Sequence, residues 1–393
     1  MTYDFDKPVP RRGTHCVKWD EAPEGVLPMW VADMDFETAP CVIEALRKRL
    51  EHGVFGYNYI PDSFYDSIIW WQSHRHQWTP RREWIQYTSG VVPALSAIVR
   101  GLCKPGTPVM FFTPAYNCFF SSVRNNDCRM VEFPLTWSPA EERYSIDFDA
   151  FERTIVDEHV YLFILCNPHN PTGRVWTREE LTSIAEICAR HQVIVLSDEI
   201  HCEFLNPELG RPFLPFAPIA DAAGCQWVVT SAPNKAFNIA GLMTSYIITP
   251  VPEYYAAIER ARNINEVCDI NCFGFIALEA AYSPEGEEWF TQLNDYIYAN
   301  YRLFRDTLKA AVPSLPIAPL EGTYLAWLDV AALGYDSQSL VNYLMEERHL
   351  WVNPGDMYGK AGFLRVNLAT QRANVETALK RFLPLPKFSD LKP

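Results

Sequence analysis

The sequence predicts an α/β protein in which a large domain with a mostly parallel sheet is joined to a smaller α+β domain. From about residue 83 to residue 248, short apolar runs alternate with amphipathic stretches of helical length, as in sheets covered by helices. After roughly residue 284 the pattern changes to one long helix followed by two short strands. A chain of 393 residues also exceeds the usual size of a single core, so two closely packed domains are expected.

Seven short apolar runs are the predicted strands of the large domain. They span residues 83–88, 108–114, 129–135, 161–168, 193–198, 227–232 and 245–250. Between two of these runs, residues 177–192 place Leu181 and Cys188 on one helical face. Thr177, with Glu180 three residues later, forms a capping box that marks the start of this helix.

The smaller domain is predicted from a long helix at residues 287–312 and from strands at 323–330 and 363–369. The first 45 or so residues hold turns and the start of one helix, which is too little for a core of their own. We therefore expect them to pack on the small domain, with the active site between the two domains. The predicted division is 1–45 for this N-terminal segment, 46–283 for the large domain and 284–393 for the small domain.

Composition and charge indicate a cytoplasmic protein whose partners are small molecules. The formal net charge of −14 repels nucleic acid and anionic membrane surfaces. No uncharged apolar run reaches the roughly 18 residues that span a bilayer, and the N-terminus lacks the apolar core of a signal peptide. The eleven cysteines are scattered without a CxxC pair, so we expect reduced thiols and no metal site.

Lys235 is the first candidate for chemistry. It follows the apolar run 227–232 and precedes a turn that contains Gly241. This position places its side chain at the carboxyl edge of the sheet, where open α/β folds bind ligands. An isolated lysine is more often an ordinary surface residue, so other residues must support the assignment.

Two polar residues follow neighbouring apolar runs at the same predicted edge. Asp198 ends the run 193–198, where a carboxylate is costly unless a cation faces it; alternatively, it caps a helix or joins a salt bridge. Asn167 stands in a loop that Pro168, Pro171 and Gly173 shape into a sharp turn. Its amide can therefore point at a ligand.

Two weaker signals concern a phosphate and a flat ring. Ser89 and Gly90 precede a predicted helix, so the free backbone amides near Val91 and Val92 can bind a phosphate. Tyr116 follows a strand and a proline turn, which suits it to stack on a ring, although a tyrosine among phenylalanines is more often part of a core.

The combination predicts an enzyme that uses pyridoxal 5′-phosphate. This cofactor needs a lysine amine for its aldehyde, an acid that faces its pyridine nitrogen, a stacking ring and amides for its phosphate. Lys235 would form the Schiff base. Asp198 would keep the pyridine nitrogen protonated, so that the ring accepts electrons from a carbanion at the substrate α carbon.

The order of the motifs resembles the class I/II aminotransferase superfamily of pyridoxal phosphate enzymes, fold type I. The motifs that carry this resemblance are Tyr116, NPHNPTG at 167–173, SDEIH at 197–201, the Lys235 motif and FLRVN at 363–367. PMWVADMDF at 28–36, FGYNYIP at 55–61 and SGVVPAL at 89–95 are similar to the cystathionine β-lyase or carbon-sulfur lyase branch. The resemblance covers nearly the whole chain. It implies a carbon-sulfur β-lyase that converts L-cystathionine or related cysteine S-conjugates to a thiol, pyruvate and ammonia.

The resemblance also implies roles around the cofactor. Lys235 would be the catalytic residue that carries the α proton, and Asn167 would hydrogen-bond the phenolic oxygen of the ring. His201 would neighbour the same oxygen, unless it is a core histidine with satisfied hydrogen bonds. Tyr116 would stack on the ring, Asp198 would pair with its nitrogen, and Val91 with Val92 would give amides to the phosphate.

The remaining implied residues concern the substrate and a second subunit. Arg365 would clamp the substrate α-carboxylate with two parallel donors, and Asp33 and Tyr324 would line the same mouth. The alternative for Arg365 is a surface salt bridge, for which an arginine between apolar neighbours on a strand is poorly placed. Tyr57 would reach the phosphate held by the neighbouring subunit, which makes the protein a homodimer with shared active sites.

Three positions depart from the transaminase pattern. Asn234 replaces a serine that commonly precedes the lysine, and Ala232 and Met243 stand where many transaminases carry a phosphate-binding serine and arginine. These departures agree better with the lyase branch and leave the phosphate anchors partly assigned. Two alternatives stay open: an amino acid aminotransferase with the same residues, and a binding or regulatory protein that retains only the fold.

Overall fold

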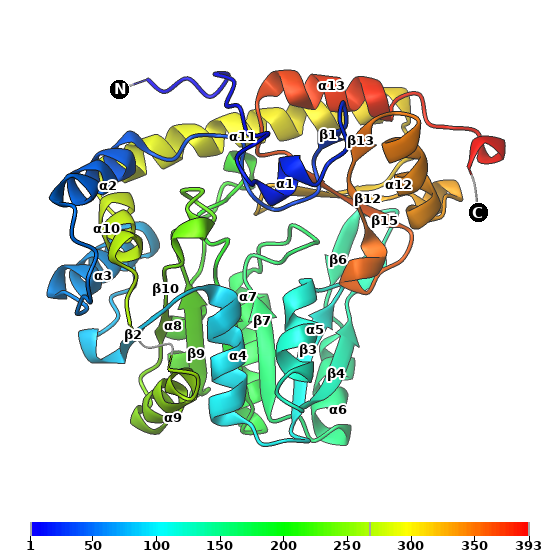
Figure 1. Cartoon of the computed structure of the whole chain (residues 1–393). Helices are drawn as coiled ribbons and strands as arrows, with labels where there is room; N and C mark the ends of the chain where they lie inside the picture. The colour runs from blue at the N-terminus through cyan, green and yellow to red at the C-terminus, as the bar shows by residue number, and fades with distance from the viewer. Residues whose placement is uncertain (1, 267–268, 392–393) are drawn as a thin grey trace.

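The computed structural model describes residues 2–266 and 269–391, and a mixed sheet stands at its centre (Figure 1). Within the described residues this sheet has seven strands in the order β2-β10-β9-β8-β7-β3-β4. β10 is antiparallel to both of its neighbours and the other pairs are parallel. The strands are β2 (Ile85–Thr88), β3 (Pro108–Thr113), β4 (Arg129–Pro134), β7 (Leu162–Cys166), β8 (Ile194–Asp198), β9 (Trp227–Ser231) and β10 (Ser245–Ile248). Each comes from a predicted run, so the mostly parallel sheet is confirmed.

Successive side chains of each strand point to opposite faces of the sheet, and both faces are covered. Val109 and Phe111 of β3 belong to a core shared with α4 and α5, whereas Met110 and Phe112 belong to a core shared with α6, α7 and α8. Burial on both faces explains why the strands read as nearly continuous apolar runs. The helices that accompany the sheet are α3 (Asp62–His76), α4 (Val91–Leu102), α5 (Asn117–Arg124), α6 (Phe148–Asp157), α7 (Arg178–Arg190), α8 (Phe216–Ala223), α9 (Pro252–Asn263) and α10 (Cys272–Ala281).

The predicted capping box of α7 is present. The Thr177 side chain accepts a hydrogen bond from the backbone of Glu180, and the Glu180 carboxylate accepts one from the backbone of Thr177. Both bonds satisfy amides that lack a partner in the first turn of a helix. Leu181 and Cys188 are buried, as the predicted apolar face of this helix requires.

A second, antiparallel sheet lies above the first in Figure 1, with α11 running across the top of the molecule and α13 along part of it. Its order is β11-β12-β15-β14 in the described chain. The N-terminal β1 pairs in parallel with β13, and α2 packs against α10 and α11. The residue limits of the three predicted segments stay a prediction. The elements are α1 (Val17–Asp20), α2 (Pro40–His52), α11 (Pro284–Ala311), α12 (Ser337–Glu346), α13 (Arg372–Phe382), β1 (Leu27–Pro28), β11 (Ile317–Ala318), β12 (Leu325–Asp329), β13 (Leu350–Trp351), β14 (Asn353–Pro354) and β15 (Phe363–Asn367), with a small hairpin of β5 (Thr136–Ser138) and β6 (Arg143–Ser145).

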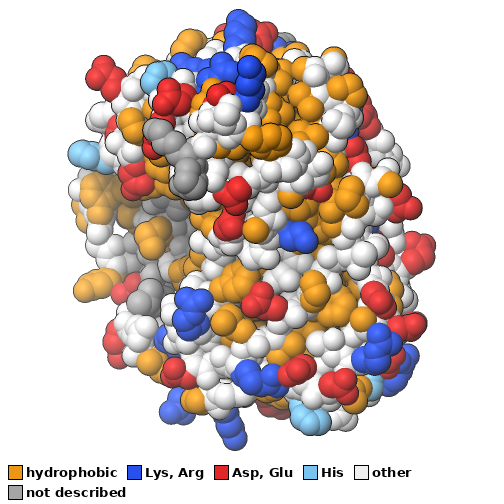
Figure 2. Space-filling model, turned by 90° about the vertical axis from the view of Figure 1, so that its right-hand side faces the viewer, with side chains coloured by type: hydrophobic (Ala, Val, Ile, Leu, Met, Phe, Trp, Pro, Cys, Tyr) orange, Lys and Arg blue, Asp and Glu red, His pale blue; other side chains and the backbone are white. Residues whose placement is uncertain are grey.

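The surface carries charges of both signs. On the face shown in Figure 2, lysine and arginine side chains are interspersed with aspartate and glutamate, most densely along the lower edge, among apolar areas. Among the described helices, none combines the length and the apolar character needed to cross a bilayer.

Candidate active site

A cavity of about 500 Å³ lies at the carboxyl ends of the central parallel strands. Asp198 is the last residue of β8, Cys166 is the last residue of β7, and Lys235 follows the end of β9 by four positions. Ligands of open α/β folds bind at this edge because the loops after the strands converge there. The cavity brings together seven of the residues that the sequence singled out, namely Val91, Val92, Tyr116, Asp198, His201, Lys235 and Arg365.

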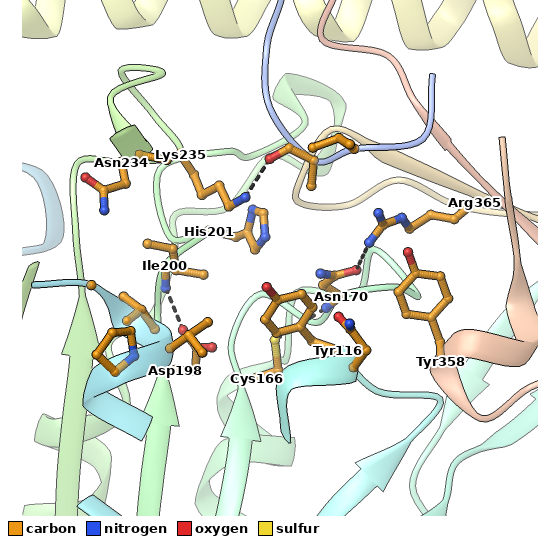
Figure 3. Close-up of a pocket in the computed structure, with 18 of the residues that line it drawn as sticks. Tyr116, Cys166, Asn170, Asp198, Ile200, His201, Asn234, Lys235, Tyr358 and Arg365 are labelled. Atoms are coloured by element: carbon orange, nitrogen blue, oxygen red, sulfur yellow. Dashed lines mark hydrogen bonds between the residues drawn. The ribbon is translucent and has the colours of Figure 1, made fainter. Parts of the chain in front are cut away.

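Lys235 reaches into this space from the loop after β9 (Figure 3). Its Nζ donates a hydrogen bond to the backbone oxygen of Ala32 over 2.5 Å. Burial and the nearby charge of Arg365 lower the pKa of the amine to about 8, against the opposing effect of Asp33, Asp198 and Cys118. The amine is therefore easier to deprotonate than a surface lysine, as its use as a nucleophile requires.

Asp198 presents a buried carboxyl group to the same cavity. Its Oδ1 accepts a hydrogen bond from the backbone amide of Ile200 over 3.1 Å. Burial raises the pKa of this carboxyl to about 7, which the bond from Ile200 and the charge of Lys235 only partly oppose. A cationic ring nitrogen placed beside Asp198 would reverse this shift and hold the carboxylate ionised.

His201 stands neutral in the cavity wall. Burial, together with the charges of Lys235 and Arg365, lowers the pKa of its imidazole well below the ordinary value. In the described structure its Nδ1 is buried without a hydrogen-bond partner. The ring lies 5.8 Å from that of Tyr324, with the two planes at 71°. A neutral imidazole with an unused nitrogen is free to hydrogen-bond a ligand oxygen.

The first turn of α4 and the ring of Tyr116 close the cavity from the large sheet. Gly90 is the N-cap of α4 and supplies no side-chain cap, so the first amides of the helix face outward. These amides and the positive end of the helix dipole form an anion site. Tyr116 is the N-cap of α5, and its ring points into the cavity beside Asn170.

Arg365 lies on β15, across the cavity from Lys235. Arg365 is only 4% exposed. Its Nη1 donates a hydrogen bond to Asn170 Oδ1 over 3.3 Å, and its Nη2 donates one to the backbone oxygen of Trp30 over 3.0 Å. Among the described residues it has no carboxylate within ion-pair distance, and its Nε has no partner. A buried guanidinium without a counter-charge is suited to bind a carboxylate from outside.

Four predicted site residues lie outside the cavity wall. Asn167 is buried, with its Nδ2 bonded to the oxygen of Leu214 and its Oδ1 without a partner in the described structure. Tyr324 donates its hydroxyl to the oxygen of Ala32 over 2.9 Å, and Asp33 forms an ion pair with Arg11 over 2.7 Å. Tyr324 and Asp33 therefore support the segments that line the cavity without lining it themselves. Tyr57 is 96% exposed and borders a separate surface hollow.

Asn170, Asn353 and Tyr358 are among the site residues to which the sequence assigned no role. Asn170 belongs to the NPHNPTG motif, in which the sequence indicated a ligand contact for Asn167 alone. Asn353 donates its Nδ2 to the oxygen of Trp30 and to the hydroxyl of Tyr358, each over 2.9 Å. The Asn-Pro-Gly turn at 353–355 is the one signal that points to this region. The departures Asn234 and Met243 also line the cavity.

A second group of buried side chains has the chemistry of metal ligands. Ligand atoms of His76, Cys202 and Glu203 lie within 4.8 Å of one another. The Glu203 carboxylate already accepts hydrogen bonds from His76 over 2.8 Å, Trp71 over 2.7 Å and Arg75 over 3.3 Å. Because the Arg75 charge opposes a cation here, we assign this group to the packing of α3 against the loop after β8.

The sequence pattern of the family Aminotransferase class I and II matches residues 24–382. The chain belongs to this family. It is 38% identical over 385 residues to cystathionine beta-lyase PatB of Bacillus subtilis, which covers 96% of this chain and 98% of PatB. Among solved structures, cystalysin from Treponema denticola, which contains pyridoxal 5′-phosphate, has a TM-score of 0.92 and 32% identity over 97% of this chain and 98% of its own. The PLP-bound C-S lyase from Staphylococcus hominis has a TM-score of 0.89 and 30% identity over 97% of both chains. These likenesses establish the fold type I architecture.

The residues present fit pyridoxal 5′-phosphate. Asp198 offers a carboxyl group to a ring nitrogen, and the first turn of α4 offers amides to a phosphate. In the described structure, lining residues also leave three buried polar atoms without partners: His201 Nδ1, Asn234 Oδ1 and Arg365 Nε. Orphaned buried polar atoms are costly in a protein interior, so such a group of them indicates a site built for a polar ligand.

Proposed function

We propose that this protein is a pyridoxal 5′-phosphate-dependent carbon-sulfur β-lyase. Its substrates are L-cystathionine or related cysteine S-conjugates, and its products are a thiol, pyruvate and ammonia. The observation that carries the proposal is the single cavity that joins Lys235, Asp198 and Arg365. Its lyase character rests on the relatives, since PatB is similar over nearly the whole length of both chains. The aminotransferase alternative is less favoured for the same reason.

When bound, pyridoxal 5′-phosphate supplies an electron sink for the carbanion that forms at the substrate α carbon. Lys235 anchors the cofactor and, once its amine is free, takes the α proton. The pKa of about 8 leaves a useful fraction of this amine unprotonated near neutral pH. Asp198 holds the proton of the ring nitrogen in place, and Tyr116 supports the ring. Breaking the bond between the β carbon and sulfur then releases the thiol, and water converts the remaining fragment to pyruvate and ammonia.

Arg365 binds and orients the substrate carboxylate. Its Nη1 and Nη2 already bond to Asn170 and Trp30, so the plane of the guanidinium is set before the substrate arrives. Preset geometry lowers the entropic cost of placing the α hydrogen near Lys235. His201 stays neutral because of its lowered pKa, and it hydrogen-bonds the phenolic oxygen without adding a second cation. Asn167 also hydrogen-bonds the phenolic oxygen, and Asp33 and Tyr324 support the walls around the substrate.

The active form is a homodimer in which Tyr57 reaches the site of the partner. Two features support this proposal. The Tyr57 side chain is almost fully exposed, although a large aromatic ring gains free energy by burial. Val54, Phe55 and Tyr59 in the same segment are exposed as well, and the hollow beside them has a volume of about 370 Å³.

The cytoplasm is the compartment in which this enzyme works. The ten cysteines that the structure describes are all free thiols, which is typical of proteins from a reducing compartment. Its partners are small amino acid substrates, and we include no nucleic acid or membrane among them. A purely binding function is less favoured, since Lys235, Asp198 and Arg365 are all retained.

The deciding experiment supplies the holoenzyme with L-cystathionine as the only substrate. A lyase releases many equivalents of pyruvate and ammonia per site, because it needs no acceptor for the amino group. An aminotransferase stops after it has converted one equivalent of substrate per site, because the amino group stays on the cofactor until an oxo acid removes it. Turnover that resumes only after an oxo acid is added overturns the proposal in favour of the aminotransferase. Release of only a trace of pyruvate alongside fast transamination also overturns the proposal.

A further inference from the structure

Residues 30–36, which we call the strap, contribute Trp30, Val31 and Ala32 to the cavity wall and belong to no helix or strand in the described chain. The peptide groups of such a segment have no ladder partners, and buried carbonyls need a hydrogen bond from elsewhere. Each of the seven strap carbonyls accepts one from a side chain. The strap is therefore positioned by side chains rather than by secondary structure.

The donors to the strap come from three distant parts of the sequence. The N-terminal part contributes Arg11 and Lys18, the loop after β9 contributes Lys235 and Asn238, and the C-terminal part contributes Tyr324, Asn353, Arg365, Asn367 and Gln371. The strap thus connects the lysine loop with the strand that carries Arg365. Two strap oxygens bond to site residues: the oxygen of Trp30 accepts a hydrogen bond from Arg365, and the oxygen of Ala32 accepts one from Lys235.

Asn238 makes more bonds to the strap than any other single amide group described. Its Nδ2 donates to the oxygens of Met34 and Phe36, each over 2.9 Å, and its Oδ1 accepts from the backbone of Met34 over 3.1 Å. Its backbone is left-handed, with φ of 54°, a conformation that asparagine tolerates better than most residues. This conformation turns the amide toward the strap only three positions after Lys235.

We propose that Asn238 is a positioning residue that ties the strap to the lysine loop, so that the Ala32 oxygen holds the Lys235 amine whenever the cofactor is not bonded to it. The Ala32 oxygen accepts from Lys235 Nζ over 2.5 Å and from the Tyr324 hydroxyl over 2.9 Å. Ala32 lies two residues before Met34, whose backbone N–H and oxygen both bond to the Asn238 side chain. The inference rests on the proposed function only in taking Lys235 as the cofactor lysine.

Loosening the strap has two consequences for Lys235. A carbonyl acceptor stabilises the protonated amine, so its loss lowers the pKa of Lys235 further. The other charged or titratable groups that act on this amine are Arg365, which lowers its pKa, and Asp33, Asp198 and Cys118, which raise it. The amine also loses the contact that orients it, and misplacement of a reacting group by about 1 Å costs on the order of 100-fold in rate.

The test uses Asn238→Gly, because glycine adopts the left-handed conformation and removes all three bonds. In the cofactor-free protein, acylation of Lys235 is measured against pH by mass spectrometry; we expect its midpoint to fall by about 0.5 unit or more. In the holoenzyme, exchange of the α hydrogen of L-alanine with deuterium oxide is measured by nuclear magnetic resonance. We expect this exchange to slow by about 10-fold or more at unchanged cofactor content.

The matched control is Asn294→Ala, which removes one Nδ2 bond of 2.9 Å to the oxygen of Leu205, outside the strap. It should leave both measurements as in the wild type. A wild-type midpoint and wild-type exchange in Asn238→Gly overturn the proposal. If that variant does not fold, Asn238→Asp keeps the size of the side chain but replaces the donor of the bonds to Met34 and Phe36 by an acceptor and adds a negative charge. Slowed exchange in this variant supports the proposal and wild-type exchange overturns it. Alanine has no leaving group, so the exchange reports on Lys235 whether the enzyme proves to be a lyase or an aminotransferase.

Discussion

The guanidinium of Arg365 lies over the ring of Tyr358, with its central carbon 4.5 Å from the ring centroid. Asn353 in turn donates a hydrogen bond to the Tyr358 hydroxyl over 2.9 Å. An arginine stacks on an aromatic face through its planar group and keeps its edge free for two parallel hydrogen bonds. The aromatic ring and the asparagine therefore set the plane in which a substrate carboxylate is bound.

Replacing Arg365 by lysine should raise the KM for amino acid substrates by about 10-fold or more, because an ammonium group neither stacks in this way nor forms the bidentate pair. The measurement is steady-state kinetics with a cysteine S-conjugate. Arg372→Lys is the matched control, since Arg372 also lies over a tyrosine ring, that of Tyr296, but outside the cavity. An unchanged KM in Arg365→Lys would exclude the carboxylate role.

Replacing Lys235 by alanine should leave a folded protein that borohydride cannot join covalently to pyridoxal 5′-phosphate. The reason is that the reduction fixes the cofactor only to an amine that has condensed with its aldehyde. Mass spectrometry of the reduced wild type should locate the cofactor on Lys235. Lys104→Ala, distant in the sequence from the lysine loop, should behave as the wild type. Finding the reduced cofactor on another lysine contradicts the assignment.

In the cofactor-free protein, the buried carboxyl groups of Asp198 and Glu199 should contribute a loss of stability as pH rises from about 4 to about 7. The buried imidazoles of His169 and His201, whose pKa values are lowered, contribute a gain over the lower part of the same window. Burial raises the pKa of Asp198 to about 7 and that of the adjacent Glu199 to about 8, from ordinary values near 4. Across this window these two carboxyl groups release their protons in the unfolded chain and retain them in the folded chain, so they give the stability a negative slope against pH; below about pH 4 both states are protonated and this contribution vanishes. Asp198→Asn should reduce this slope by about 1.4 kcal/mol per pH unit in the free energy of unfolding measured with urea. Parallel pH dependences in variant and wild type would refute the raised pKa.

Mixing homodimers of Tyr57→Phe and Lys235→Ala should restore activity, because one of the two sites in the heterodimer draws both residues from intact chains. Each variant alone is expected to be impaired. The activity is measured after subunit exchange has been verified by native mass spectrometry. Tyr59→Phe, a change at another exposed tyrosine of the same segment, serves as the control and should be active on its own. Verified exchange without recovered activity argues against a shared site.

Much of the fold is determined by local features of the sequence. A strand buried on both faces is mostly apolar along its length, and a side-chain cap marks the start of α7, so β7, β8 and α7 are visible in short windows. The same locality explains why Lys235 and Asp198 were predicted at one edge. Both follow strands of a mostly parallel sheet, and the carboxyl ends of such strands converge.

Only the tertiary structure decided how the walls around these residues are built. Arg365 bonds to Asn170, 195 positions away, and to Trp30, 335 positions away. Such pairs follow from how two sheets and an irregular strap pack, and no periodicity records them. The direction of a side chain is decided in the same way: Asn167 Nδ2 donates to the oxygen of Leu214, 47 positions away, a partner that no local pattern indicates. The sequence by itself thus determined which elements form and where their ends meet, because those depend on neighbouring residues. The structure decided which polar groups touch across them, because that depends on packing between segments far apart in the chain.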